Sequence, residues 1–128
     1  MAWNETKLTV VGAVCNDIRT RTTNDGEPML FFTIASHERK FNRDTETWEN
    51  GNSVLVKVKA FRKLAEHAGA SLVPGDRVVA TGRVYTNKYE VDGQTRSDLE
   101  MEASCIGPDL TICPVTIERG GQLAAVAA

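Results

Sequence analysis

The sequence is poor in several features that would point to a specialised class of protein. Its 128 residues include three cysteines and two histidines, which argues against a disulfide scaffold and against a histidine-based metal or catalytic centre. No apolar run approaches the roughly 18 residues of a membrane span. Residues 1–5 show no basic stretch followed by an apolar segment, so we expect no signal peptide. We therefore expect a cytoplasmic protein without metal or cofactor.

The chain also lacks an excess of positive charge. Its formal net charge is −2 and its pI is about 5.7, whereas a strongly basic chain would indicate nucleic acid. The charges are nevertheless uneven. Residues 39–63 carry seven Lys or Arg against three Asp or Glu, and residues 97–118 carry five acidic residues and no basic one. Charge alone favours an ordinary mixed surface, but an acidic chain can still carry one cationic groove.

Turn signals divide the chain into segments rich in Val, Thr, Ile and Phe, which is typical of a β protein. These signals are Asn24-Asp25-Gly26, Asn50-Gly51, Pro74-Gly75 and Asp92-Gly93. We predict strands at about 5–15, 29–39, 53–61, 76–90 and 95–106. A helical spacing of Leu64, Ala65, Ala68 and Leu72 predicts one helix between strands three and four. This order predicts an all-β OB-fold, a five-stranded Greek-key barrel with that single helix.

The third predicted strand has two different faces. We assign one face to the core, with Val54, Val56, Val58 and Ala60. The other face carries Leu55, Lys57, Lys59 and Phe61. Cations interleaved with apolar and aromatic groups suit single-stranded nucleic acid, because ammonium groups meet phosphates while flat groups meet bases. On this strand alone, a half-exposed strand with solubilising lysines is an equally good interpretation.

Two further clusters combine cations with aromatic rings. The expected loop between strands two and three carries Arg39, Lys40, Phe41 and Arg43 and is closed by Trp48 and the Asn50-Gly51 turn. The arm of strand four carries Arg83, Tyr85, Lys88 and Tyr89. The alternatives are that the loop rings pack on each other and that the tyrosines form a cross-strand ladder. All three clusters fall on the usual oligonucleotide-binding side of an OB-fold, which favours binding.

The first strand and the cysteines raise the question of subunit contacts. Both faces of residues 8–15 are largely apolar, which a subunit interface or cover by the protein's own tail would explain. Cys105 follows apolar residues at period two, so we predict it in the core. Cys15 and Cys113 are expected near subunit boundaries. Free thiols are the default for them, and a disulfide between subunits is the minority hypothesis.

Several segments in one order resemble bacterial single-stranded DNA-binding proteins over roughly residues 4–112. They are residues 4–12 (NETKLTVVG), 32–36 (FTIAS), 63–66 (KLAE) and 74–83 (PGDRVVATGR). The resemblance implies an OB-fold homotetramer that wraps single-stranded DNA without sequence preference, in replication, recombination or repair. It also implies a place in the cytoplasm, associated with the nucleoid.

The resemblance assigns stacking aromatics near Phe41 and at Phe61 and Tyr89. The family often has a tryptophan at the position of Leu55, a role that Trp48 would partly replace. The pattern of residues 42–51 resembles a branch in which a C-terminal strand clamps a neighbouring subunit, and Thr111–Ile117 has strand composition. We therefore expect an OB-fold domain at 1–110 and a clamp strand with a short tail at 111–128. The acidic tip that recruits partner enzymes in the family is not found before Ala128. Either the sequence is trimmed or the chain is a short paralogue, and from this sequence we expect no such recruitment.

Two other function classes remain as alternatives. An OB-fold subunit of a primosome-like complex would use the same face to bind proteins. An enzyme is the weakest alternative, because Asp25, Glu27 and His37 do not have the spacing of a catalytic or metal site. We expect no enzymatic activity.

Overall fold

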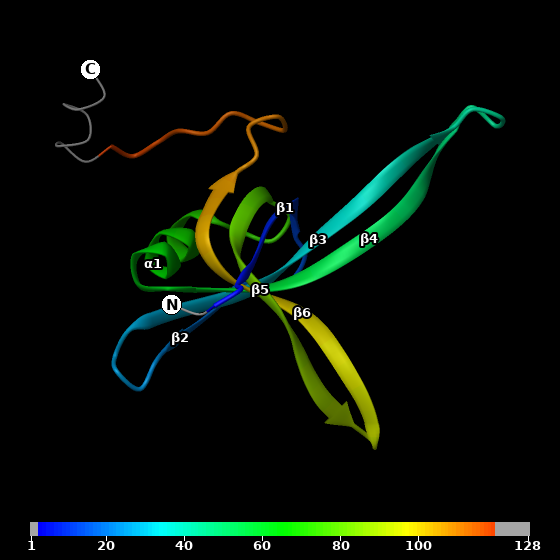
Figure 1. Ribbon diagram of the computed structural model, residues 1–128. Coiled ribbons are helices and arrows are strands. Elements are labelled where there is room, and N and C mark those ends of the chain that lie inside the picture. Colours follow the sequence, from blue (N-terminus) through cyan, green and yellow to red (C-terminus); the bar gives the residue numbers. More distant parts are fainter. Residues whose placement is uncertain (1–2, 120–128) are drawn as a thin grey trace.

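The computed structural model describes residues 3–119. Its elements are β1 (Thr6–Val14), β2 (Arg19–Thr22), β3 (Pro28–Asn42), β4 (Thr47–Phe61), α1 (Arg62–Ser71), β5 (Arg77–Val91) and β6 (Gln94–Pro108). The pairs β3–β4 and β5–β6 extend from the body as two long antiparallel arms (Figure 1). No helix within residues 3–119 is long and apolar enough to cross a membrane.

The strands form one sheet that closes on itself. Their order is β1-β5-β6-β4-β3-β2, and β1 also pairs with β3 through Ala13–Ala35 and Val14–Ile34. The five long strands therefore make a ring, in which β4 and β6 run parallel and the other neighbours antiparallel. These strands, with α1 between the third and fourth of them, confirm the predicted OB-fold.

The core lies inside the ring, as the alternation of apolar residues predicts. Leu30, Ile34, Val56, Val78 and Met101 are fully buried. The predicted helix is confirmed, and it packs on the core through its two buried residues, Ala65 and Ala68. The assignment of Val54 to the core is wrong, since its side chain is 45% exposed. β4 pairs with β6 at residues 57–59. Val54 precedes these residues and lies in the part of β4 that belongs to the arm.

The strand β2 was not predicted, because its four residues are all exposed and show no apolar alternation. It pairs with the start of β3, from Arg19–Phe31 to Thr22–Pro28. The predicted turn at Asn24-Asp25-Gly26 joins these two strands, and Gly26 has the positive φ of 83° that the turn requires.

The prediction of a turn at Asn50-Gly51 is wrong, because both residues lie within β4. The chain reverses at residues 43–46 instead, so the expected long loop is part of an antiparallel hairpin arm. Asn42 starts this reversal. Its side-chain oxygen accepts hydrogen bonds from the backbone N–H groups of Asp44, at 2.9 Å, and Thr45, at 3.3 Å.

The prediction that Cys105 lies in the core is also wrong, because the residue is exposed. Gly82 pairs with Ala103 while Thr81 pairs with Cys105, so Ser104 is an extra residue in β6. This bulge shifts the alternation by one residue. Ile106 packs against the core in place of Cys105.

A close approach of β1 and β3 at Gly12 closes the ring. A Cβ atom at Gly12 would overlap the backbone of Ala35 and press on the side chain of Ile34. We expect Gly12→Ala to lower the free energy of unfolding by about 1–3 kcal/mol, measured by urea denaturation. Gly107→Ala is the matched control, because nothing lies within 4 Å of a Cβ there. Equal stability of the two variants would contradict this account of ring closure.

Candidate nucleic-acid interface

The strand registers bring residues from four strands onto one side of the sheet. Lys59 of β4 lies beside Phe31 of β3 and, across the parallel pairing, beside Glu102 of β6. The next row places Lys57 between Thr33 and Glu100. On β5, Arg83 pairs with Glu102 and Tyr85 with Glu100. We call this side the outer face, since the alternate residues of the same strands fill the core.

The β3–β4 arm adds an aromatic pair to the outer face. The rings of Phe41 and Trp48 have centroids 5.4 Å apart and planes tilted by 54°. Their side chains remain 48% and 61% exposed. The two rings therefore contact each other, as the alternative interpretation of this cluster supposed, but their exposed area leaves both accessible to a flat ligand.

A bulge directs Trp48 to the outer face. His37 pairs with Ser53 but Arg39 pairs with Asn50, so two residues of β4 lie opposite one residue of β3. Without this extra residue, the even-numbered Trp48 would point to the side opposite Lys57. The bulge reverses the alternation and aligns Trp48 with the cations of the outer face. Arg39 is on the same side, where it donates a hydrogen bond to Asn50 at 3.1 Å.

Carboxylates of β6 are interleaved with the cations of the outer face. Lys57 Nζ lies 2.6 Å from Asp98 Oδ2, and Arg83 Nη2 lies 2.8 Å from Glu102 Oε2. The hydrogen bond to Asp98 raises the pKa of the Lys57 ammonium above its ordinary value. The bond to Glu102 likewise raises the pKa of the Arg83 guanidinium. Two of the predicted phosphate-binding cations therefore already have anionic partners.

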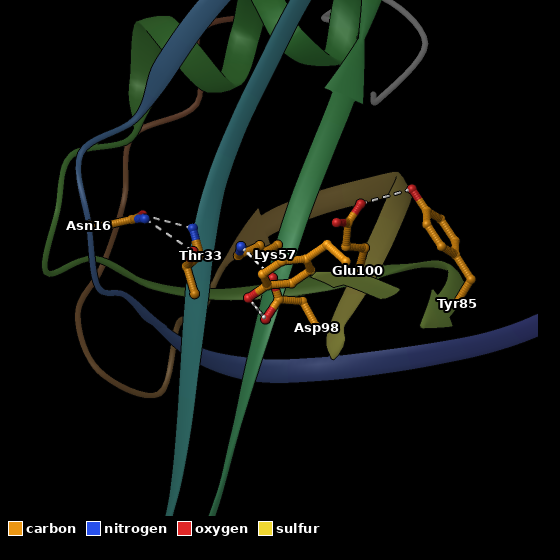
Figure 2. Close-up of polar contacts among 7 residues, drawn as sticks. Asn16, Thr33, Lys57, Tyr85, Asp98 and Glu100 are labelled. Atoms are coloured by element: carbon orange, nitrogen blue, oxygen red, sulfur yellow. Dashed lines mark hydrogen bonds and ion pairs between the residues drawn. The ribbon is translucent and has the colours of Figure 1, made fainter. Parts of the chain in front are cut away.

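The two tyrosines of β5 differ in their surroundings. Tyr85 donates a hydrogen bond to Glu100 at 3.2 Å (Figure 2). Its ring centroid is 5.1 Å from Lys59 Nζ and 4.8 Å from Arg83 Cζ, so two cations contact the ring. Tyr89 lies further along the arm, is 38% exposed, and has its hydroxyl 3.5 Å from Asp98. Tyr89 is therefore the more accessible ring.

Comparison with known proteins agrees with this geometry. Residues 5–108 match the Single-strand binding protein family. The chain belongs to this family. It is 40% identical over 120 residues to the single-stranded DNA-binding protein of Corynebacterium glutamicum, and 40% identical over 121 residues to that of Bifidobacterium longum. These alignments cover 93% and 92% of the chain but 53% and 56% of the two relatives, so the chain spans about half of their length.

Two solved structures of the family have a similar fold. The small single-stranded DNA-binding protein of Streptomyces coelicolor superposes with a TM-score of 0.78 at 33% identity, over 86% of this chain and 99% of that one. The second single-stranded DNA-binding protein of Mycobacterium smegmatis gives 0.72 at 33% identity, over 90% and 99%.

The outer face of this single-strand binding family member collects most of the predicted site residues. They are Arg39, Phe41, Trp48, Leu55, Lys57, Lys59, Phe61, Arg83, Tyr85 and Tyr89. Lys40 and Lys88 lie on the opposite sides of their arms, because Lys40 pairs with Glu49 and Lys88 with Ser97. Arg43 lies in the turn between β3 and β4. For all of these predicted site residues, the role in DNA binding stays a prediction.

Other residues of the outer face were missed. Arg19 and Arg21 belong to β2, which was not predicted, and Phe31 precedes the segment on which the resemblance rests. A period-two alternation was the available signal, since the half-buried Phe31 and Thr33 alternate with Leu30, Phe32 and Ile34, which are buried.

Cys15 and Cys113 are exposed free thiols, like Cys105. The expectation that Cys15 and Cys113 lie near subunit boundaries stays a prediction. A disulfide between subunits stays a prediction.

Proposed function

We propose that the chain binds single-stranded DNA without sequence preference and without catalysis. The observation that carries the proposal is the outer face, where the partly exposed rings of Trp48, Phe61 and Tyr89 share one side with Lys57 and Lys59. Rings stack on any base, and cations neutralise the backbone that all sequences share, so this combination binds without reading base edges. The names of the relatives support the same function.

We further propose that four copies assemble and that one long strand wraps around them. The free edge of β1 supports this assembly. Within residues 3–119, β1 pairs with β5 along Thr6–Ala13, but its other edge meets β3 only at Ala13 and Val14. Leu8 and Val11 on that strand are 38% and 40% exposed. An unpaired edge beside exposed apolar side chains favours pairing with a second copy.

The C-terminal segment is proposed as the clamp of the assembly. Residues 109–119 form no strand within one chain, although Ile112, Val115 and Ile117 are 58%, 44% and 63% exposed. A strand partner on a neighbouring subunit would cover these side chains. The proposed division into 1–110 and 111–128 follows from this, with residues 120–128 outside the described part. We propose that the chain acts in replication, recombination or repair, in the cytoplasm and at the nucleoid.

The proposed function predicts strong salt dependence despite the acidic pI. Each phosphate neutralised on a single strand adds about −0.7 to the slope of log K against log salt. We expect tryptophan fluorescence to be quenched by poly-thymidine, with Trp48 as the reporter, and the affinity to fall steeply between two salt concentrations. Trp48→Phe, which leaves Trp3 in place, shows which tryptophan reports.

A duplex of the same length is the control ligand. A slope near zero, or equal affinity for duplex and single strand, would overturn the proposed function. Binding of proteins without binding of DNA would favour the interaction subunit instead.

A further inference from the structure

We propose that the binding surface continues across β2, where Phe31 stacks on a base and Arg19 and Arg21 contact phosphates. This inference rests on the proposed function and extends it to residues that the sequence patterns did not identify.

The register makes the extension continuous with the outer face. Phe31 pairs with Lys59 on one side and with Arg19 on the other. In the neighbouring row, Met29 lies between Phe61 and Arg21. A single strand of DNA that leaves Phe61 or Lys59 in the direction of β3 therefore reaches Phe31 next and the two arginines after it.

The side chains form a shallow site rather than a flat edge. The Arg21 guanidinium carbon lies 5.2 Å from the centroid of the Phe31 ring. Beside the ring is a hollow of about 290 Å³, lined by Asn16, Asp17, Arg19, Phe31, Phe32, Thr33 and Lys57. Lys57 thus belongs both to this hollow and to the face already described, which joins the two.

Hydrogen bonds fix one wall of the hollow. Asn16 accepts a hydrogen bond from the backbone N–H of Thr33 at 2.8 Å and donates one to the Thr33 hydroxyl at 3.1 Å (Figure 2). Both bonds hold the loop after β1 against β3. The hollow beside Phe31 is therefore formed before any ligand arrives, which lowers the entropy that binding must overcome.

The charges on β2 are available, unlike those of Lys57 on β4 and Arg83 on β5. Lys57 and Arg83 must give up Asp98 and Glu102 to meet a phosphate. Among residues 3–119, no ion pair within 4.0 Å involves Arg19 or Arg21, although Asp17 lines the same hollow. Both arginines are exposed, so a phosphate can reach them without displacing a carboxylate.

The alternative is that Arg21 covers Phe31 only to protect an edge strand. That role would affect stability and leave DNA affinity unchanged. The arginine variants separate the two roles, because both side chains are exposed and their loss should leave the fold intact.

The test compares Phe31→Leu, Arg19→Gln and Arg21→Gln with the wild type, using poly-thymidine at several salt concentrations. Each arginine variant should make the salt slope less negative by about 0.7. Phe31→Leu should weaken binding by roughly 5–150-fold, the equivalent of one stacked base, and Phe31→Trp should retain it. Arg77→Gln is the matched control. It removes the same charge from an arginine at the far end of β5, where Arg77 lies 3.7 Å from Asp109.

The outcomes distinguish this inference from the proposed function. Suppose that both arginine variants keep the affinity and salt slope of the wild type while Phe61→Ala weakens binding. This result would overturn the extension across β2 and leave the proposed function standing. No binding by the wild type would overturn the proposed function and the extension with it. Should Phe31→Leu not fold, the salt slopes of the arginine variants decide the question.

Discussion

Phe61→Ala and Tyr89→Ala should each weaken binding to single-stranded DNA by about 1–3 kcal/mol, which is the contribution of one stacked base. Tyr89 is 38% exposed on the β5–β6 arm. Phe61 ends β4 on the outer face and is half-buried. Neither ring is among the fully buried core residues, so the fold should survive both changes. Fluorescence titration gives the affinity, and thermal unfolding checks the folded state.

Conservative variants sharpen this test. Tyr89→Phe keeps the ring and removes only the hydroxyl that lies 3.5 Å from Asp98, so its affinity should stay near that of the wild type. Leu55→Ala should matter less than either aromatic change, because Leu55 is 59% exposed but has no π face. Unchanged affinity in both alanine variants would show that DNA follows another path. Loss of the folded state would show that the rings support the core.

Alternation along the strands was enough to predict the fold and much of the outer face. The pattern from Leu55 to Phe61 separates side chains correctly, because β4 is regular there, pairs with β3 throughout and pairs with β6 at residues 57–59. The helix was equally predictable, since Ala65 and Ala68 recur at helical spacing and are its buried residues. Where a strand stays regular, the residues of its buried face determine which residues lie on the opposite face.

Bulges limited what the sequence could predict. The extra residue in β6 moved Cys105 to the surface, and the extra residue in β4 turned Trp48 towards the outer face. A bulge depends on how two strands pair, so the sequence of either strand by itself does not reveal it. The Asn50-Gly51 pair has the composition of a turn, but the reversal depends on the side chain of Asn42, eight residues earlier than Asn50.

The position of the acidic run was the other feature beyond the reach of the sequence. Residues 97–118 are acidic and residues 39–63 are basic, but the charge pattern alone does not show where the two segments lie relative to each other. The parallel pairing of β4 with β6 places Glu100 beside Lys57 and Glu102 beside Lys59. A long-range pairing of this kind follows from topology and is not encoded in local charge.

These carboxylates lead to the second large expected effect. Replacing Asp98, Glu100 and Glu102 by Asn, Gln and Gln should strengthen binding to single-stranded DNA by roughly tenfold, about 1.4 kcal/mol. The change removes three negative charges from the outer face and releases Lys57 and Arg83 from their ion pairs. With two more cations free to meet phosphates at about −0.7 each, the salt slope should become steeper by about 1.4.

The triple variant should keep its fold, because exposed ion pairs contribute only about 0–1 kcal/mol each. Asp109→Asn is the matched control. It also removes a carboxylate that pairs with an arginine, but at the Arg77 end of β5. A triple variant with the affinity and slope of the wild type would mean that phosphates do not compete with these carboxylates. Lys57 and Arg83 would then stabilise the sheet only, and the DNA path would have to run through Lys59, Phe61 and the cations outside these pairs.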